Sequence, residues 1–194
     1  MADTNSFLND LAKAADSFAR WHVIRNAGDE RDKFAVDGLL KVLEFPAPDL
    51  GDTDERAIAA WSLGRLGLHA FADRVPSSGS EVGKSSLHRA GIVDALGETR
   101  DPRASDLLAK ILRVDNDRAV WLNGTLALSK MGECALENIE DLAAISSFEQ
   151  RLMLLDAIYK IGGDASRASF ERVHGIFSAN ELDQANDFLS KYAY

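Results

Sequence analysis

Glycine recurs along this chain in one context, directly after an apolar residue that ends a segment with helical spacing. The five repeating glycines are Gly28, Gly67, Gly97, Gly132 and Gly162, separated by 39, 30, 35 and 30 residues. The residues one position before them are Ala27, Leu66, Leu96, Met131 and Ile161, and those four positions before them are Ile24, Leu63, Val93, Leu128 and Ile158. This spacing keeps one face of a helix apolar. A repeat of this kind restricts the fold more than any other feature of the sequence.

A second apolar segment follows most of the glycines, at residues 33–45, 102–114, 134–145 and 165–177. Each segment is long enough for about three helical turns. The glycine after the last periodic residue is typical of a helix C-cap, where a positive φ costs glycine little. One helical hairpin cannot bury both of its faces, so neighbouring hairpins are expected to stack. We therefore expect an all-α chain in which residues 1–194 form a single α-solenoid domain of about five helical hairpins, with residues 181–192 as a capping helix at the C-terminal end.

The stretch from residue 97 to residue 132 resembles a HEAT repeat, most closely the short HEAT-like type of phycobilisome bilin lyases and many bacterial scaffold proteins. The second helix of that repeat has the form V-R-x-x-A-x-x-A-L-G-x-I-G, which residues 54–67 and 149–162 match. Arg56 and Arg151 occupy the arginine position, whereas the other copies have Ser17, Ser86 and Trp121 there. The resemblance covers about residues 16–177 and implies an armadillo-type superhelix of stacked helix pairs.

In the family that this chain resembles, the arginine pairs with an acidic turn residue of a neighbouring repeat. The turn acids available here are Asp52, Asp54, Asp115 and Asp117. A partner-facing role for Arg56 and Arg151 is the alternative.

Residues 78–85, with the sequence SGSEVGKS, differ at one position from the phosphate-loop pattern G-x-x-x-x-G-K-[ST], because Ser78 replaces the first glycine. A phosphate loop follows a strand and precedes a helix, so that backbone N–H groups converge on the phosphates. The preceding segment, residues 68–75, is instead typical of a short helix, and Glu81 would bring a negative charge to the anion. We therefore interpret residues 76–85 as a flexible loop between repeats.

The chain contains 31 acidic and 22 basic residues, which gives a net charge of −9. Nucleic acid is an unfavourable partner for such a chain, because affinity for it comes mainly from Lys and Arg. Acidic residues cluster at the expected turns 29–32, 49–55 and 115–117. These clusters are interpreted either as solvated loops or as an acidic rim that attracts a basic protein.

The single cysteine, Cys134, cannot form an internal disulfide and suits a reducing compartment. The first ten residues lack a basic segment followed by an apolar one, and no apolar run approaches the ~20 residues of a membrane span. The four histidines show neither metal-binding spacing nor the His-Glu dipeptides of an iron-binding HEAT-repeat family, the deoxyhypusine hydroxylases. We therefore expect a cytoplasmic protein that needs no metal and no cofactor.

Two further positions, counted back from each repeating glycine, indicate best where a partner would bind. Ten residues before the glycines lie Phe18, Ala57, Leu87, Leu122 and Leu152, and six residues before them lie His22, Trp61, Gly91, Leu126 and Asp156. In the resembled repeats these positions tend to face the concave side of the stack. We expect Trp61, Trp121, Leu122 and Leu126 to form an apolar patch there, since exposed patches and Trp residues mark binding surfaces. Packing of these side chains against neighbouring helices is the alternative.

The function that we favour is a non-enzymatic scaffold that binds a protein partner on its concave face. The resemblance implies one alternative, a bilin lyase or chaperone-like subunit acting on phycobiliproteins. The acidic composition suits a second alternative, an immunity protein that neutralises a basic toxin.

Overall fold

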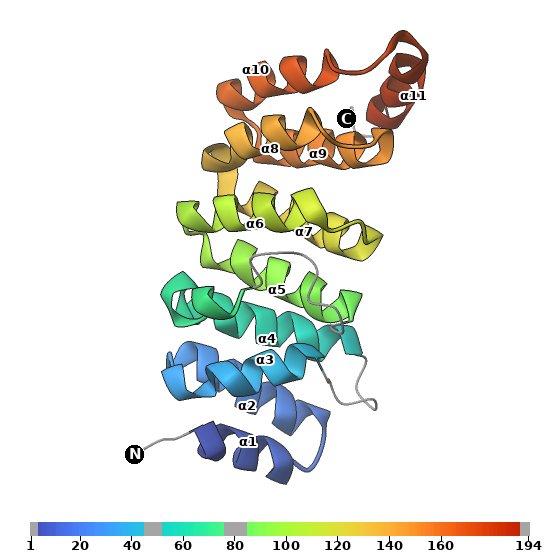
Figure 1. Ribbon diagram of the computed structural model, residues 1–194. Coiled ribbons are helices and arrows are strands. Elements are labelled where there is room, and N and C mark those ends of the chain that lie inside the picture. Colours follow the sequence, from blue (N-terminus) through green and yellow to red (C-terminus); the bar gives the residue numbers. More distant parts are fainter. Residues whose placement is uncertain (1–3, 45–51, 76–84, 191–194) are drawn as a thin grey trace.

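The computed structural model describes residues 4–44, 52–75 and 85–190, and in this part of the chain the regular structure is entirely helical (Figure 1). The helices are α1 (Thr4–Lys13), α2 (Ser17–Asp29), α3 (Val36–Glu44), α4 (Asp52–Leu66), α5 (Ser86–Thr99), α6 (Pro102–Val114), α7 (Arg118–Met131), α8 (Leu136–Ala143), α9 (Phe148–Ile161), α10 (Gly163–His174) and α11 (Ala179–Ser190). Short 3-10 helices precede α3 (η1, Lys33–Ala35), follow α4 (η3, Leu68–Ala70; η4, Ala72–Arg74) and precede α8 (η5, Gly132–Ala135). The prediction of an all-α chain is confirmed for the described residues.

The helices form two layers that extend from one end of an elongated stack to the other (Figure 1). The first layer, which we call the glycine layer, consists of α2, α4, α5, α7 and α9, and each of these helices packs against the next. The second layer consists of α1, α3, α6, α8 and α10, each of which packs against a helix of the glycine layer. Helix α11 lies at the C-terminal end of the stack and contacts α9.

The second layer is interrupted after α4, where the sequence lacks a long amphipathic segment. The chain forms η3 and η4 at this point, and α3 contacts α5 directly. Leu68, Phe71 and Val75 bury their side chains in the core from these short helices. Residues 68–75 are therefore helical turns, as the sequence predicts, and no strand precedes the phosphate-loop-like segment.

The helices that contain the repeating glycines all belong to one layer, but the glycines themselves are of two kinds. Gly67, Gly132 and Gly162 directly follow a helix and have φ values of 86°, 74° and 69°. This left-handed backbone strongly favours glycine, because a Cβ atom would crowd the following carbonyl oxygen. The predicted C-cap role is confirmed for these three residues.

The predicted C-cap role is wrong for Gly28 and Gly97, because α2 and α5 continue past them. Both glycines instead allow two helices to come close together. A Cβ atom on Gly28 would lie 2.7 Å from the Cα atom of Ser62 in α4, and one on Gly97 would lie 2.7 Å from the Cβ atom of Ala127 in α7. These distances are shorter than the ~3.5–4.0 Å between ordinary neighbouring carbon atoms, so the glycine layer depends on the two glycines for its tight spacing.

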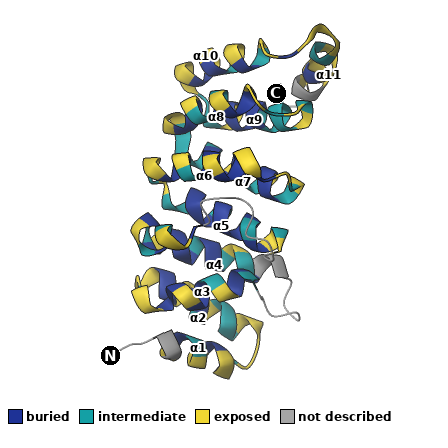
Figure 2. Ribbon diagram, in the orientation of Figure 1, coloured by how far each residue is buried: buried dark blue, intermediate teal, exposed yellow. Residues whose placement is uncertain are grey.

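A single hydrophobic core fills the space between the two layers and continues along the stack (Figure 2). Its largest fully buried side chains come from both layers and include Leu39, Leu43, Leu63, Leu96, Leu108, Leu128, Ile139 and Leu154. Helix α5, near the middle, is the helix with the most buried residues in the described part of the chain. Each such aliphatic side chain contributes about 1.5–3 kcal/mol when it leaves water, which makes burial between the layers the main force that holds the stack together.

Two further predictions concern segments near the uncertain residues. The expected loop 76–85 lies outside the described residues except for Ser85, whose hydroxyl oxygen accepts a hydrogen bond from the His88 N–H at the start of α5 (3.2 Å). The expected capping helix at residues 181–192 corresponds to α11, whose last described residue is Ser190. Within the described ranges, no helix has both the length and the apolar character needed to cross a membrane.

Candidate functional site

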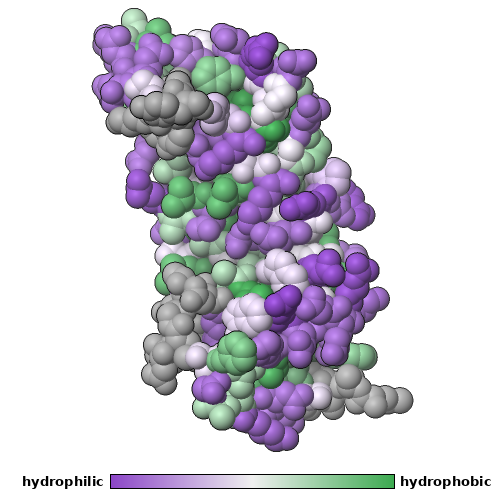
Figure 3. All heavy atoms as spheres, turned by 180° about the vertical axis from the view of Figure 1, so that it is seen from behind, coloured by the Kyte–Doolittle hydropathy of each residue, from purple (hydrophilic) through white to green (hydrophobic). Residues whose placement is uncertain are grey.

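The glycine layer has one face against the core and another that is open to solvent. The residues ten positions before the repeating glycines lie on the side that is open to solvent. Phe18, Ala57, Leu87 and Leu122 are exposed there, and Leu152 is half-buried. We call this side the open face of the glycine layer. Seen from behind (Figure 3), apolar atoms gather on the stack at the height of α7 and α9.

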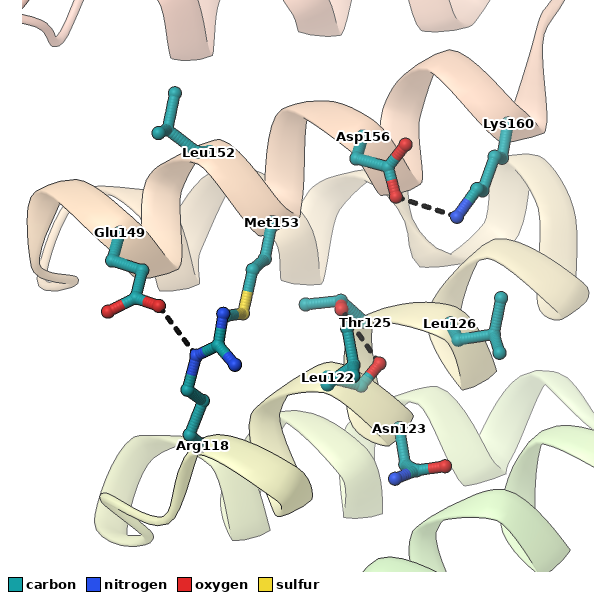
Figure 4. A pocket seen from close by; sticks show the side chains of 10 residues that line it. All are labelled: Arg118, Leu122, Asn123, Thr125, Leu126, Glu149, Leu152, Met153, Asp156 and Lys160. Carbon is teal, nitrogen blue, oxygen red and sulfur yellow. Dashed lines mark hydrogen bonds and ion pairs between the residues drawn. The ribbon is translucent and has the colours of Figure 1, made fainter. Parts of the chain in front are cut away.

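A groove with a volume of about 580 Å³ lies between α7 and α9. Its lining consists of Arg118, Leu122, Asn123, Thr125, Leu126, Glu149, Leu152, Met153, Asp156 and Lys160 (Figure 4). We call it the α7–α9 groove. Two leucines of α7 are unusually open for apolar side chains, since Leu122 is 57% exposed and Leu126 is 40% exposed. Met153 points from α9 towards α7 and closes the space between the two helices (Figure 4).

Ion pairs flank the apolar part of the groove. Arg118 of α7 donates to the Glu149 carboxylate of α9 at 2.8 Å, and Lys160 donates to the Asp156 carboxylate at 2.7 Å (Figure 4). The two cations and two anions cancel, so the groove has apolar walls and no net charge. Such a combination of an apolar centre and a polar rim is typical of surfaces that bind protein segments.

The orientation of α7 is set by the turn that precedes it. Asp117 caps the helix by accepting hydrogen bonds from the Ala119 and Val120 N–H groups. The Trp121 indole N–H donates to the Asp115 backbone carbonyl at 2.7 Å, which pulls this side chain into the protein. Because neighbouring helical residues point about 100° apart, Leu122 then faces outwards.

A capping box fixes the start of α9 on the other side of the groove. The Ser147 hydroxyl accepts from the Gln150 N–H, and the Gln150 side chain accepts from the Ser147 N–H. This reciprocal arrangement satisfies two backbone donors that a helix start otherwise leaves open. It positions Glu149 and Met153 one turn apart along the groove.

The expected patch therefore needs two corrections, at Trp121 and at Trp61. Trp121 is only 3% exposed and its N–H group already has an internal partner, so its predicted role as an exposed anchor is wrong. Leu122 and Leu126 are both exposed and both line the α7–α9 groove. Trp61 is half-buried and lies on α4, away from the groove.

Arg56 and Arg151 both have hydrogen-bond partners within the fold. The Arg56 guanidinium donates to the Leu43 backbone carbonyl near the end of α3 (3.0 Å), so it satisfies a helix C-terminus. Arg151 donates to the Glu181 carboxylate of α11 at 2.5 Å and lies over the Phe177 ring. Both arginines join neighbouring elements of the stack. The side chains of Asp52 and Asp54 lie outside the described part of the structure.

Several acids of the expected rim have partners within the fold. Asp32 and Asp117 cap η1 and α7. Glu55 and Asp115 are buried and pair with arginine side chains, and Asp29 pairs with an arginine one turn earlier in α2. Burial therefore contradicts both interpretations of these clusters, solvated loops and a free acidic rim, for Glu55 and Asp115, whereas the Asp29 side chain is 43% exposed.

Charged residues also join adjacent helices across the glycine layer. Lys130 of α7 donates to the Asp94 and Glu98 carboxylates of α5 at 2.7 Å and 2.5 Å. Burial by itself would lower the pKa of Lys130, but these two hydrogen bonds outweigh it and raise that pKa. The lysine therefore stays charged and holds α5 and α7 in register.

A second group of side chains on the open face combines Phe18, His22 and Trp61 with three residues that the sequence analysis did not single out, Trp21, Arg25 and Arg65. Trp21 and Trp61 lie on α2 and α4, and the Arg25 guanidinium carbon is 5.1 Å from the first ring and 5.9 Å from the second. The guanidinium carbon of Arg65 is 5.7 Å from the Trp61 ring. Phe18 and Trp21 make edge contacts with the His22 ring. We call these six side chains the aromatic–arginine cluster: Phe18, Trp21, His22, Arg25, Trp61 and Arg65.

A sequence signal for this cluster exists. The pattern Trp-x-x-x-Arg occurs in both helices, as Trp21 with Arg25 and as Trp61 with Arg65. Residues four positions apart are neighbours on a helix surface, so each arginine is placed over a tryptophan of its own helix. What the pattern does not reveal is that Arg25 also reaches the tryptophan of the adjacent helix.

The described residues offer no group of three or more His, Cys, Asp or Glu side chains that is arranged to hold a metal ion. The geometry of the open face instead provides apolar, aromatic and charged contacts. Comparison of the sequence with protein-family models and with curated proteins gives no match.

Proposed function

We propose that this protein is a non-enzymatic scaffold, an α-solenoid of HEAT-like helix pairs, that holds a segment of a partner protein in the α7–α9 groove. The observation that carries the proposal is the exposure of Leu122 and Leu126 at a hollow of about 580 Å³. Soluble proteins normally cover apolar side chains gathered in this way, and larger exposed groups of them mark interaction sites. The groove runs along two parallel rows of helical side chains, which suits an amphipathic helix or an extended segment.

The polar groups of the groove support a protein segment as its occupant. The Arg118–Glu149 and Asp156–Lys160 pairs flank the leucines and can remain solvated at the rim when the centre is covered. Rim pairs of this kind contribute mainly to the alignment of the bound segment and to the rate of association. The apolar centre contributes most of the affinity.

Site-specific photo-cross-linking tests this function. Benzoylphenylalanine replaces Leu126 in the groove, or Ile176 after α10 as a control of nearly equal exposure. We expect the protein with the probe at position 126 to form a defined cross-link in its native cells, and mass spectrometry identifies the partner. A phycobiliprotein subunit or a basic toxin as the cross-linked partner would favour one of the two alternative functions.

The purified partner then provides the quantitative test. Leu122→Asp should weaken its binding by about thirtyfold or more, because a carboxylate that loses its hydration in an apolar contact costs ~2 kcal/mol and the neighbouring Arg118 is already paired with Glu149. Val114→Asp is the matched control, since Val114 is 54% exposed but belongs to α6 in the second layer. Equal binding by both variants, or cross-links only from position 176, would refute the proposal.

A further inference from the structure

The aromatic–arginine cluster is a second surface on the open face, separate from the α7–α9 groove. The two surfaces belong to different helices of the same layer, with α5 between α4 and α7. Phe18 is 70% exposed, and the Arg25 side chain is 45% exposed although it contacts both tryptophan rings. Trp and Arg are enriched among the residues that dominate protein interfaces.

Charge distinguishes this cluster from the groove. Arg25 is paired with Asp29 at 3.2 Å, whereas Arg65 has no ion-pair partner in the described part of the chain. Two guanidinium groups and one carboxylate leave one positive charge at this place, on a chain whose net charge is −9. A basic partner would be repelled here at short range.

We infer that the aromatic–arginine cluster binds a carboxylate that lies beside an aromatic residue in the partner protein. The inference rests on the proposed function, in which the open face of the glycine layer is the docking surface. The Glu or Asp carboxylate would pair with Arg65, and the aromatic ring would lie against Trp61 and Phe18.

The position of Arg65 is the reason for a carboxylate. Its guanidinium carbon lies 5.7 Å from the Trp61 ring, so a partner that covers the ring also removes water from the guanidinium. A desolvated cation without a counter-charge opposes binding strongly. The planar guanidinium matches a carboxylate through two parallel hydrogen bonds. An acidic side chain is therefore the group that allows Trp61 to be covered without leaving a bare charge.

NMR titration of the protein tests this inference, because the chain contains only three indole groups. Trp21 and Trp61 belong to the cluster, whereas Trp121 is buried and hydrogen-bonded to Asp115, so it serves as an internal control. The first probe is a short peptide with one Phe between two Glu residues. The second has Gln in place of each Glu, and the third is single-stranded oligothymidine.

We expect the Glu peptide to shift the Trp21 and Trp61 indole signals in a saturable way and to leave the Trp121 signal in place. It should bind about tenfold more tightly than the Gln peptide, as one charge-assisted pair provides. Arg65→Gln should abolish this difference, while Arg167→Gln, which removes an exposed arginine from α10, should preserve it.

Equal affinity for the two peptides, no shift with either peptide, or tighter binding of oligothymidine would overturn the inference. A preference for Glu that survives in Arg65→Gln would also overturn it, since the carboxylate would then bind elsewhere. None of these results depends on the groove, which the cross-linking experiment tests separately.

Discussion

The close approach of α5 and α7 predicts that adding one methyl group will destabilise the protein. In Gly97→Ala the new Cβ atom would lie 2.7 Å from the Ala127 Cβ atom and 2.8 Å from the Cα atom of the same residue. Carbon atoms in ordinary contact are about 3.5–4.0 Å apart, so the helices would have to separate by about 1 Å. Because one of the two atoms belongs to the backbone of α7, no change of rotamer relieves this overlap.

The size of the effect follows from two opposing contributions. Overpacking of a tight core costs about 1–3 kcal/mol, and the overlap with backbone places Gly97→Ala near the upper value. Alanine is better than glycine inside a helix by about 1 kcal/mol, which offsets part of this cost. We expect a net loss of about 2 kcal/mol in the free energy of unfolding.

Urea unfolding followed by circular dichroism measures this loss. With a urea m-value of about 3 kcal/mol/M, the midpoint should fall by about 0.7 M. Adding Ala127→Gly should restore part of the stability lost in Gly97→Ala, because it removes the nearest methyl group but not the overlap with the backbone of α7. Gly132→Ala is a control for backbone strain: it meets no atom within 4 Å but has a φ of 74°, so it should lose only about 1 kcal/mol. An unchanged or raised midpoint in Gly97→Ala would refute the close approach of the two helices.

Three ion pairs give further predictions. Arg89→Met should destabilise the protein by about 3–5 kcal/mol in urea unfolding, because it leaves the buried Asp115 carboxylate without its bidentate partner. Arg103→Gln, at an exposed pair, should leave the urea midpoint nearly unchanged, and an equal loss in both variants would contradict the difference in burial. A hydrogen bond from Arg172 lowers the pKa of Glu140, so this carboxylate stabilises the folded state above its ordinary pKa of 4.5 and loses that effect as the pH falls through the lowered value. Glu140→Gln should therefore cost about 1 kcal/mol at neutral pH and progressively less below about pH 4; a difference that is constant with pH would count against the pair.

Much of the candidate site follows from the glycine register. The period places Leu122 and Leu126 on one side of a helix whose opposite side carries Leu128, and the structure finds the first two exposed and the last one buried. A helical period is enough for this distinction because it depends on angles around a single axis. The sequence also indicates where the second layer is weak, since no long amphipathic segment follows Gly67.

Trp121 and the acidic residues could not be assigned in the same way. The indole of Trp121 is drawn inwards by the Asp115 carbonyl, a hydrogen bond that depends on the path of the preceding turn. The acids at the turns were interpreted from their clustering alone, which does not reveal that Asp115 pairs with Arg89 or that Glu55 pairs with Arg20. These partners lie 26 and 35 residues away along the chain, so local patterns carry no information about them.

The sequence by itself determined that this chain is helical and that Leu122 and Leu126 lie on the side of their helix opposite to Leu128. These properties depend on the spacing of side chains along single helices. Only the tertiary structure decided that Gly28 and Gly97 are points of close approach, that Arg56 and Arg151 bind internal partners, and that Arg25 lies between tryptophans of two helices. Each of these depends on the distance between two helices, which is set by the packing of many side chains at once.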